Sequence, residues 1–239
     1  MLLGYNVFKS SLENIDLNHN KIINTINPHS YCISKQDKVF EKALETSDIL
    51  LPDGIGIVWA EKFLNQTVIQ KIAGYDLFLF LMQQLEKDKG SVFFLGASNE
   101  TLNKIEAKCK IDFPNVSVCF YSPPYKSEFS SSDSIEMCNA VNSVQPDVLF
   151  IGMTAPKQEK WLHRFKDKLE VKNICCIGAV FDFYTGNIKR SSDFWISLGF
   201  EWLPRLIKEP KRLFHRNFVS TPKFILEVLS FKIFGKGIL

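Results

Sequence analysis

Two short polar clusters in the first quarter of the chain contain the residue types that acid–base chemistry needs. They are Thr25-Ile26-Asn27-Pro28 and Leu51-Pro52-Asp53-Gly54-Ile55-Gly56, and each follows a short apolar run that is typical of a β-strand. Because the carboxyl ends of parallel strands meet at one edge of a sheet, we expect Thr25, Asn27 and Asp53 to converge on one crevice. Asp53 adjoins a flexible Gly-x-Gly turn, which suits a general base that must approach a substrate hydroxyl.

Asp53 also has a purely structural interpretation. Pro-Asp-Gly is a common turn sequence, and Asp53 would then only cap the helix that follows it. From this tripeptide alone the structural interpretation is the stronger of the two. A catalytic assignment of Asp53 therefore depends on the other polar residues of the chain.

A further region with candidate functional residues is Pro156-Lys157-Gln158-Glu159, at the start of a predicted helix. Gln158 offers both a hydrogen-bond donor and an acceptor, which suits sugar hydroxyls. Glu159 lies in the first helical turn, where an acid can serve only to offset the helix dipole. Asp182, in the segment 178–186, either binds a ribose or sugar hydroxyl or caps a loop, and the sequence does not choose between these roles.

Three predicted strands end in glycine, at Gly96, Gly152 and Gly178. A buried strand that ends in glycine and passes into a helix presents backbone N–H groups to a phosphate. A single glycine of this kind would be explained by a tight strand-to-helix turn. Three of them, all at carboxyl ends, predict a nucleotide-binding crevice, because ligands of open α/β sheets bind there.

The elements that must position these residues alternate between short apolar runs and helix-period segments. Runs this uniformly apolar suit strands that are covered on both faces. We therefore predict an α/β fold, with a Rossmann-like, mostly parallel sheet and helices on both of its faces. The expected strands lie at 21–26, 48–51, 91–96, 116–121, 147–152 and 173–178, and the expected helices run to about Thr46, over 55–65 and 76–87, from Ser98, and from Asp133, which has capping-box spacing to Glu136.

Length and composition bound the class of protein. The 239 residues suffice for one large domain or a domain with an appendage, and 46% apolar with 23% charged residues is ordinary for a globular protein. The six cysteines show no CxxC spacing, which argues for a reducing compartment and against a zinc site or a disulfide framework. We find neither a signal peptide nor an apolar run of about 20 residues, and therefore expect a cytoplasmic protein.

The carboxyl-terminal tail differs in charge from the rest of the chain. From Arg205 onward, eight Lys and Arg residues stand against two Glu, a charge of +6; since the whole chain carries +3, the preceding 204 residues sum to −3. The bases of the tail alternate with large apolar residues, and prolines at 204, 210 and 222 divide it into short segments. Such amphipathic helices fit an anionic membrane surface better than nucleic acid. A helical pair packed on the domain is the alternative, and both can hold. We place the core at 1–200 and the helical appendage at 201–239.

Motifs that would indicate other chemistry are missing from the sequence. There is no Asp-x-Asp pair to hold the divalent metal of a nucleotide sugar, so we expect no metal site. The four histidines show no ligand spacing, and we interpret them as surface or structural residues. Neither GxGxxG nor GxxxxGK(S/T) occurs, which weakens a dinucleotide or P-loop interpretation, and we expect no cofactor.

Taken in order, these motifs resemble those of the WecG/TagA/CpsF family of bacterial glycosyltransferases over nearly the whole chain. The chain departs from the family pattern at Ser191-Ser192 and at Lys71, which bears on donor identity more than on reaction type. The matching segments are Thr-x-Asn-Pro at 25–28, Pro-Asp-Gly-Ile-Gly at 52–56, Gly-x-Asp-Leu at 74–77, Gly-x-x-x-Pro-Lys-Gln-Glu at 152–159, and those at 178–182, 186–190, 201–205 and 209–212.

The resemblance implies an inverting, metal-independent enzyme with a Rossmann-like core and a carboxyl-terminal appendage. Such enzymes move a sugar, often of the N-acetylmannosamine type, from a UDP donor to a polyprenyl-diphosphate-linked sugar in the biosynthesis of cell-surface polysaccharides. We accordingly expect an enzyme that is peripheral to the inner face of the plasma membrane, on an anionic surface and without a nucleic-acid partner. Homo-oligomerisation is left open.

The resemblance also implies roles for individual residues. We expect Asp53 to take the proton of the acceptor hydroxyl, with Thr25 and Gln158 as further catalytic residues. Two other classes stay open: a nucleotide-cofactor oxidoreductase on a similar fold, which a cofactor absorbance would reveal, and a non-catalytic membrane adaptor, which UDP affinity would contradict. The residues expected to bind substrate or the leaving diphosphate are Asn27, Gly54, Gly74, Gly96, Gly152, Glu159, Gly178, Asp182, Arg190, Arg205, Arg212 and Arg216.

Overall fold

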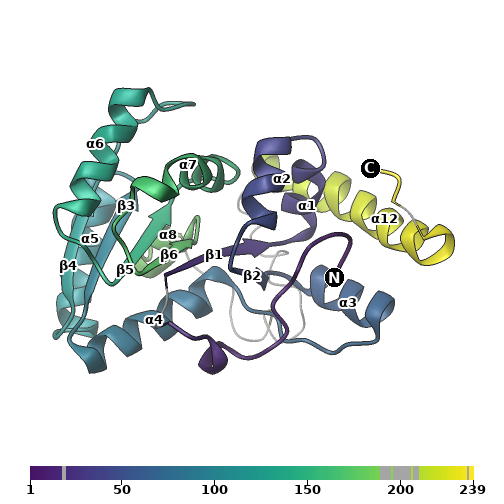
Figure 1. The fold of residues 1–239 in the computed structure, drawn as a ribbon, viewed down its shortest axis with the longest axis horizontal. Helices are drawn as coiled ribbons and strands as arrows, with labels where there is room; N and C mark the ends of the chain where they lie inside the picture. Colours follow the sequence, from purple (N-terminus) through teal and green to yellow (C-terminus); the bar gives the residue numbers. More distant parts are fainter. Residues whose placement is uncertain (18–19, 189–194, 196–205, 207–209, 236) are drawn as a thin grey trace.

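A computed structural model describes residues 1–17, 20–188, 195, 206, 210–235 and 237–239. Its centre is a six-stranded sheet in which every neighbouring pair of strands is parallel. The strands are β1 (Lys21–Ile26), β2 (Ile49–Pro52), β3 (Ser91–Gly96), β4 (Ser117–Tyr121), β5 (Val148–Gly152) and β6 (Asn173–Cys176). They follow the order β2-β1-β6-β5-β3-β4 across the sheet (Figure 1). The expected α/β fold with a parallel sheet is confirmed.

Helices connect the strands and cover both faces of the sheet (Figure 1). They are α1 (Pro28–Ser34), α2 (Lys38–Glu45), α3 (Ile55–Asn65), α4 (Gly74–Asp88), α5 (Asn99–Asp112), α6 (Ser131–Asn142), α7 (Lys157–Phe165), α8 (Val180–Thr185), α11 (Pro210–Phe214) and α12 (Thr221–Phe234), with short 3-10 turns η1 (Leu12–Asn14) and η2 (Lys166–Lys168) and a π-helical turn η3 (His215–Ser220). Helices α4, α5 and α8 share one hydrophobic cluster with the sheet, and α6 and α7 share another on the opposite face. This two-sided cover is the arrangement that the uniformly apolar strands predicted.

Strand β3 shows how both faces of the sheet become apolar, because successive residues of a strand point to opposite sides. The ring centroid of Phe94 lies 6.3 Å from that of Phe78 in α4 and 5.4 Å from that of Phe181 in α8. Phe93 and Leu95 belong to the cluster of α6 and α7 on the other side. Phe93, Phe94 and Leu95 are each at most 2% exposed. Each such side chain contributes about 1.5–3 kcal/mol through its removal from water.

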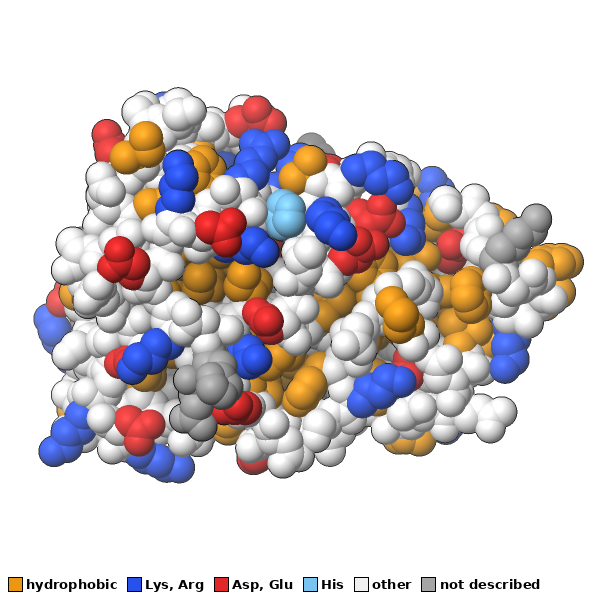
Figure 2. All heavy atoms as spheres, in the orientation of Figure 1, with side chains coloured by type: hydrophobic (Ala, Val, Ile, Leu, Met, Phe, Trp, Pro, Cys, Tyr) orange, Lys and Arg blue, Asp and Glu red, His pale blue; other side chains and the backbone are white. Residues whose placement is uncertain are grey.

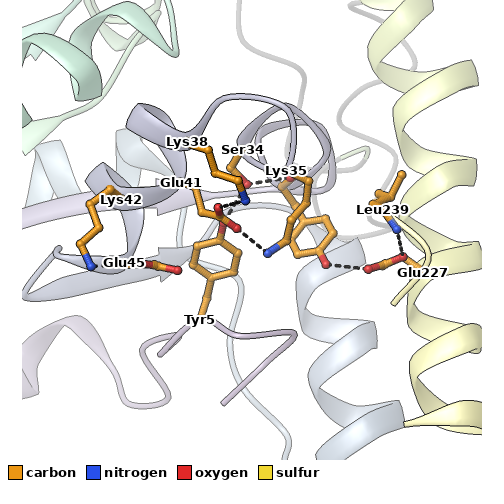
Figure 3. Close-up of polar contacts among 10 residues, drawn as sticks. Tyr5, Ser34, Lys35, Lys38, Glu41, Lys42, Glu45, Glu227 and Leu239 are labelled. Atoms are coloured by element: carbon orange, nitrogen blue, oxygen red, sulfur yellow. Dashed lines mark hydrogen bonds and ion pairs between the residues drawn. The ribbon is translucent and has the colours of Figure 1, made fainter. Parts of the chain in front are cut away.

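The carboxyl-terminal helix α12 belongs to a third hydrophobic cluster, together with α1, α2, α3 and the first residues of the chain. Phe224 and Val228 of α12 are fully buried in this cluster. Glu227 accepts hydrogen bonds from the Tyr31 hydroxyl (3.1 Å) and from the backbone N–H of Leu239 (3.0 Å), as Figure 3 shows for its carboxylate. The described part of the tail is thus packed on the domain, which is one of the two alternatives considered above. The domain boundary near residue 200 stays a prediction.

Two helix starts differ from their predictions, because capping depends on local side-chain geometry. Helix α6 is capped by Ser130, whose hydroxyl accepts the N–H of Asp133 at 3.1 Å, while the Asp133 carboxylate accepts the N–H of Ser130 at 2.8 Å. The predicted cap at Asp133 is wrong, since Asp133 is the second member of this capping box. The helical stretch expected to reach Thr46 is interrupted at 35–37, where Asp37 caps a second helix.

Phe224→Ala is expected to lower the free energy of unfolding by about 3–5 kcal/mol, because it removes a fully buried ring that packs against Tyr31. Phe234→Ala is the matched control on the same helix; its side chain is 69% exposed, and the change should stay within about 0.5 kcal/mol. Urea unfolding followed by circular dichroism measures both variants. Equal losses would show that α12 does not share the core.

Candidate active site

The carboxyl ends of β1 and β2 hold the first group of expected site residues. The two strands pair in parallel register, and beyond them the N–H of Asp53 donates to the carbonyl oxygen of Ile26 at 2.9 Å. A Cβ on Gly54 would lie 4.0 Å from the Cβ of Asn27. The structure therefore brings Thr25, Asn27 and Asp53 to one edge of the sheet, and each of them is partly exposed.

Gly54, and not Asp53, occupies the cap position of α3. Its φ of +105° lies in the region that favours glycine. The turn fits closely against Pro28, since a Cβ on Gly56 would come within 2.6 Å of the Cγ of Pro28. The structure thus assigns the cap position of α3 to Gly54. The assignment of Asp53 as the general base stays a prediction.

Asn27 has a structural task at the start of α1. Its Oδ1 accepts the N–H groups of His29 and Ser30, each at 3.0 Å, and the Ser30 hydroxyl accepts the N–H of Asn27 at 2.8 Å. This capping box pairs N–H groups that a helix start would otherwise leave open. Asn27 therefore holds the end of β1 beside Asp53, and its contact with substrate stays a prediction.

Glycines let the ends of β3 and β5 approach each other. Gly96 and Gly152 are register partners, and a Cβ on Gly96 would lie 2.7 Å from the carbonyl oxygen of Gly152. A Cβ on Gly152 would lie 2.4 Å from the ring of Phe181 in α8. No side chain fits at either position, so bare backbone forms this part of the edge. Gly178, with a φ of +58°, lies two residues past the end of β6 at Cys176, and the prediction that it ends the strand is wrong.

Gln158 joins the turns that follow β5 and β6. It is 3% exposed, and its Oε1 accepts the N–H groups of Met153 (3.2 Å) and Gly178 (3.1 Å). Its Nε2 donates to the Oε1 of Glu159 at 2.8 Å. Both ends of the amide are therefore engaged inside the protein, and two N–H groups at the turns expected to face a nucleotide are already paired. Gln158 positions these turns, and its direct contact with substrate stays a prediction.

Glu159 is a buried acid without a full set of partners. It is 3% exposed, and burial raises its pKa from the ordinary 4.5 to about 7. Among the described residues, its Oε2 has no hydrogen-bond partner, and neither has the Oδ1 of Asn24 on β1. Both residues line a small cavity between α2 and α7. Glu159 lies in the first turn of α7 as expected, but it is buried there, and burial determines the pKa of its carboxyl group.

Two further expected residues, Gly74 and Asp182, border the turn that follows β6. Gly74 is the first residue of α4, and a Cβ there would lie 3.3 Å from the carbonyl oxygen of Ile177. Asp182 of α8 is partly exposed, and its Oδ1 accepts a long hydrogen bond of 3.4 Å from Asn187. The absence of a side chain at Gly74 thus lets α4 begin close to this turn. The ligand contacts of both residues stay predictions.

The expected phosphate-binding arginines lie only partly within the described chain. Arg190 and Arg205 lie outside the described residues. Arg212 belongs to α11, but its side chain lies outside them as well. Arg216 lies in η3 and is half-buried. Of the four arginines, Arg216 is therefore the one whose surroundings the structure describes.

His29 is not among the expected site residues, yet it lies beside Arg216. Its Nδ1 is 2.8 Å from the Oγ of Ser220, and its ring centroid is 6.0 Å from that of His215. Burial, together with Arg216 and His215, lowers the pKa of His29 to about 4. This contact is where the tail meets the end of β1. The signal in the sequence is the position of His29 directly after Asn27-Pro28.

The described residues contain no group of three or more His, Cys, Asp and Glu side chains that could hold a metal ion. Metal-independent chemistry stays a prediction, which a chelation experiment tests. None of the described helices combines the length and the apolar character that a membrane crossing requires.

One family model covers both groups of site residues and the tail. The model of the glycosyl transferase WecG/TagA/CpsF family matches residues 5–237. The chain belongs to this family. It is a glycosyltransferase, and the resemblance seen in its motifs is confirmed.

Relatives within the family match over most of their length. The N-acetylglucosaminyldiphosphoundecaprenol N-acetyl-beta-D-mannosaminyltransferase of Bacillus spizizenii is 33% identical over 224 residues, which cover 93% of this chain and 84% of that protein. The enzyme of the same name from Bacillus subtilis is 31% identical over 215 residues (90% and 81%), and that from Staphylococcus aureus is 23% identical over 214 residues (90% and 82%). The similarity thus extends over the whole domain rather than over a single motif.

Glu159→Gln is expected to change how the free energy of unfolding of this glycosyltransferase depends on pH. The carboxyl has a pKa of about 7 when folded and about 4.5 when unfolded, so between these values the folded protein binds more protons and its stability falls as pH rises. The variant lacks this slope and should gain about 3 kcal/mol relative to wild type from about pH 4.5 to about pH 8. Urea unfolding across this range measures it, with the exposed Glu128→Gln as control.

His29 makes the free energy of unfolding depend on pH in the opposite direction. Its pKa is lowered from 6.5 to about 4, so the unfolded state binds more protons in that range and stability falls as pH falls. Both proteins contain His29, so its contribution cancels when the free energy of unfolding of wild type is subtracted from that of Glu159→Gln at each pH. Parallel profiles for the two proteins would contradict a buried, proton-binding Glu159.

Proposed function

We propose that this glycosyltransferase moves an N-acetylmannosamine-type sugar from a UDP donor to a polyprenyl-diphosphate-linked sugar, with inversion at the anomeric carbon. The observation that carries the proposal is the convergence of Thr25 and Asp53 at the carboxyl ends of β1 and β2. The relatives of the chain are named as N-acetyl-beta-D-mannosaminyltransferases. Those names specify an N-acetylglucosaminyldiphosphoundecaprenol acceptor. An acceptor of this class is proposed here.

The acceptor half of the proposed site lies at β1 and β2. Asp53 takes the proton of the acceptor hydroxyl as its oxygen attacks the anomeric carbon, while Thr25 orients the reacting groups. The new bond forms on the face opposite the departing UDP oxygen, and this single displacement inverts the anomeric carbon. Asn27, held by its capping bonds, keeps the end of β1 in place beside Asp53.

The donor half of the proposed site lies over the turns after β3, β5 and β6. The leaving UDP takes the electron pair of the broken bond, and without a metal its charge is stabilised by backbone N–H groups and by basic side chains. The bare backbone at Gly96 and Gly152 lets a diphosphate approach closely, and Asp182 reads the ribose. The arginines proposed to hold the donor and acceptor diphosphates are Arg190, Arg205, Arg212 and Arg216.

We also propose that the enzyme works at the inner face of the plasma membrane, where a lipid-linked acceptor resides. The tail from Arg205 onward carries a charge of +6. Large apolar side chains of α12 that do not join the core are exposed, among them Leu226 and Ile233. Exposed apolar and basic side chains on one segment favour an anionic membrane surface over nucleic acid.

Asp53→Asn is expected to lower turnover about a hundred- to ten-thousand-fold, because the amide fills the same space but cannot take the proton. UDP affinity, measured by calorimetry, should stay nearly unchanged. The assay follows transfer from UDP-N-acetylmannosamine to lipid-linked N-acetylglucosamine by mass spectrometry, and Asp88→Asn, exposed at the end of α4, is the control. Near-normal turnover in Asp53→Asn would remove Asp53 from this role.

Transfer is expected to proceed at the same rate in excess EDTA, because basic side chains and backbone N–H groups stabilise the leaving diphosphate in place of a metal. The same mass-spectrometric assay measures the rate with and without chelator. Loss of activity that Mg²⁺ or Mn²⁺ restores would show that the leaving group is stabilised by a divalent ion.

A further inference from the structure

The outward faces of helices α3 and α12 are apolar, although both helices lie at the surface. On α3, Ile55, Trp59 and Phe63 recur every four residues and are 53%, 38% and 36% exposed. The rings of Trp59 and Phe63 stack, with centroids 5.3 Å apart. So many exposed large side chains on neighbouring elements mark an interaction surface. The exposed apolar residues of α12 are Ile225, Leu226, Leu229, Phe231, Ile233 and Phe234.

The two helices lie side by side at one end of the molecule (Figure 1). The ammonium group of Lys232 on α12 lies 5.6 Å from the ring centroid of Phe63 on α3, so the two outward faces meet. Figure 2 shows apolar side chains gathered at the end of the molecule that carries α12. We call these exposed apolar residues of α3 and α12, with the lysines between them, the helix-pair surface.

The charges of the helix-pair surface are all of one sign. Each helix contains one acid and turns it inward: Glu61 of α3 is fully buried, and Glu227 of α12 is 3% exposed. The surface therefore presents positive charge and apolar side chains to its surroundings, and no carboxylate of either helix. Its exposed lysines are Lys62, Lys223 and Lys232.

An anionic bilayer matches both properties of this surface. Large apolar side chains enter the boundary between lipid head groups and acyl chains, Trp prefers that boundary, and lysines face the lipid phosphates. A symmetric dimer built on the same surface would instead bring like-charged lysines together, which is unfavourable. Charge thus favours lipid over a second copy of the chain.

We propose that the helix-pair surface docks on an anionic bilayer. Helix α12 of the basic tail forms one part of this docking surface, and α3 forms the other part through Trp59 and Phe63. This proposal rests on the proposed function, because α3 begins at Ile55, two residues after Asp53. Docking of α3 places the Asp53 turn at the level of the lipid head groups. The diphosphate of a polyprenyl-linked acceptor lies at that level, so the docked helix sets the height of the general base.

The test is binding of the full chain to vesicles of phosphatidylglycerol and phosphatidylethanolamine, measured by co-sedimentation. The double change Trp59→Ser with Phe63→Ser should weaken binding at least about tenfold. The two side chains are 38% and 36% exposed, so the thermal unfolding midpoint of the variant is measured as well, to show that it is folded at the temperature of the binding assay. Ile111→Ser is the control. Ile111 lies on α5, outside the helix-pair surface, and is 80% exposed, so this variant should bind vesicles as the wild-type protein does.

Charge reversal tests the same surface independently of the aromatic pair. Lys62→Glu with Lys232→Glu should also weaken binding to the anionic vesicles at least about tenfold, and added salt should weaken wild-type binding. Wild-type binding by both double variants overturns the proposal. It is equally overturned if the variants lose self-association in analytical ultracentrifugation while vesicle binding is unchanged, because the occupant would then be a second copy.

Transfer is measured separately, with a water-soluble short-chain acceptor in the absence of vesicles. The Trp59→Ser, Phe63→Ser protein should keep wild-type turnover on this acceptor and lose it only on acceptor embedded in vesicles. Equal loss on both acceptors would assign the two residues to the catalytic site instead. If wild type transfers to neither acceptor, the proposed function fails, and vesicle binding still decides whether the docking surface exists.

Discussion

The amide of Gln158 holds together the two turns over which the donor is proposed to lie. Its Oε1 takes the N–H of Met153 after β5 and that of Gly178 after β6, at 3.2 and 3.1 Å. A buried amide costs free energy unless its donors and acceptors are paired, so Gln158 and the two turns stabilise one another. Next to this bridge, the ring of Phe181 in α8, the helix that carries Asp182, packs so closely on Gly152 that no side chain would fit there.

Beside this bridge the protein keeps an acid whose burial is incompletely compensated. One oxygen of Glu159 accepts a hydrogen bond from Gln158, the other has no partner among the described residues, and Glu159 lines a small cavity together with Asn24. With a pKa of about 7, roughly half of the molecules carry a proton there at neutral pH. Acids with a perturbed pKa concentrate at functional sites. The position of Glu159, next to the residue that joins the turns, fits that pattern.

The carboxyl-terminal helix shows how one segment can complete a core and still present an apolar surface. Phe224 and Val228 close the cluster formed by α1 and α3, and Glu227 ties the end of the chain to Tyr31. The opposite side of α12 is apolar and basic. The exposed apolar residues of this outer side are the ones that the proposed membrane surface would cover. The alternating basic and apolar residues of the tail predict that it packs on the core and presents an apolar surface. They do not predict which residues are buried and which are exposed.

The sequence by itself determined the parallel sheet and the meeting of Thr25, Asn27 and Asp53, because both follow from local patterns. Apolar runs imply strands covered on two faces, and parallel strands place their carboxyl ends at one edge. It did not determine the cap of α6, since neighbouring Ser and Asp residues compete for that role and side-chain geometry chooses between them. Only the tertiary structure decided that Gln158 and Glu159 turn inward and that α3 lies beside α12. A polar residue in a first helical turn has the same local pattern whether it is exposed or buried, and its environment is set by contacts with segments far away in the chain.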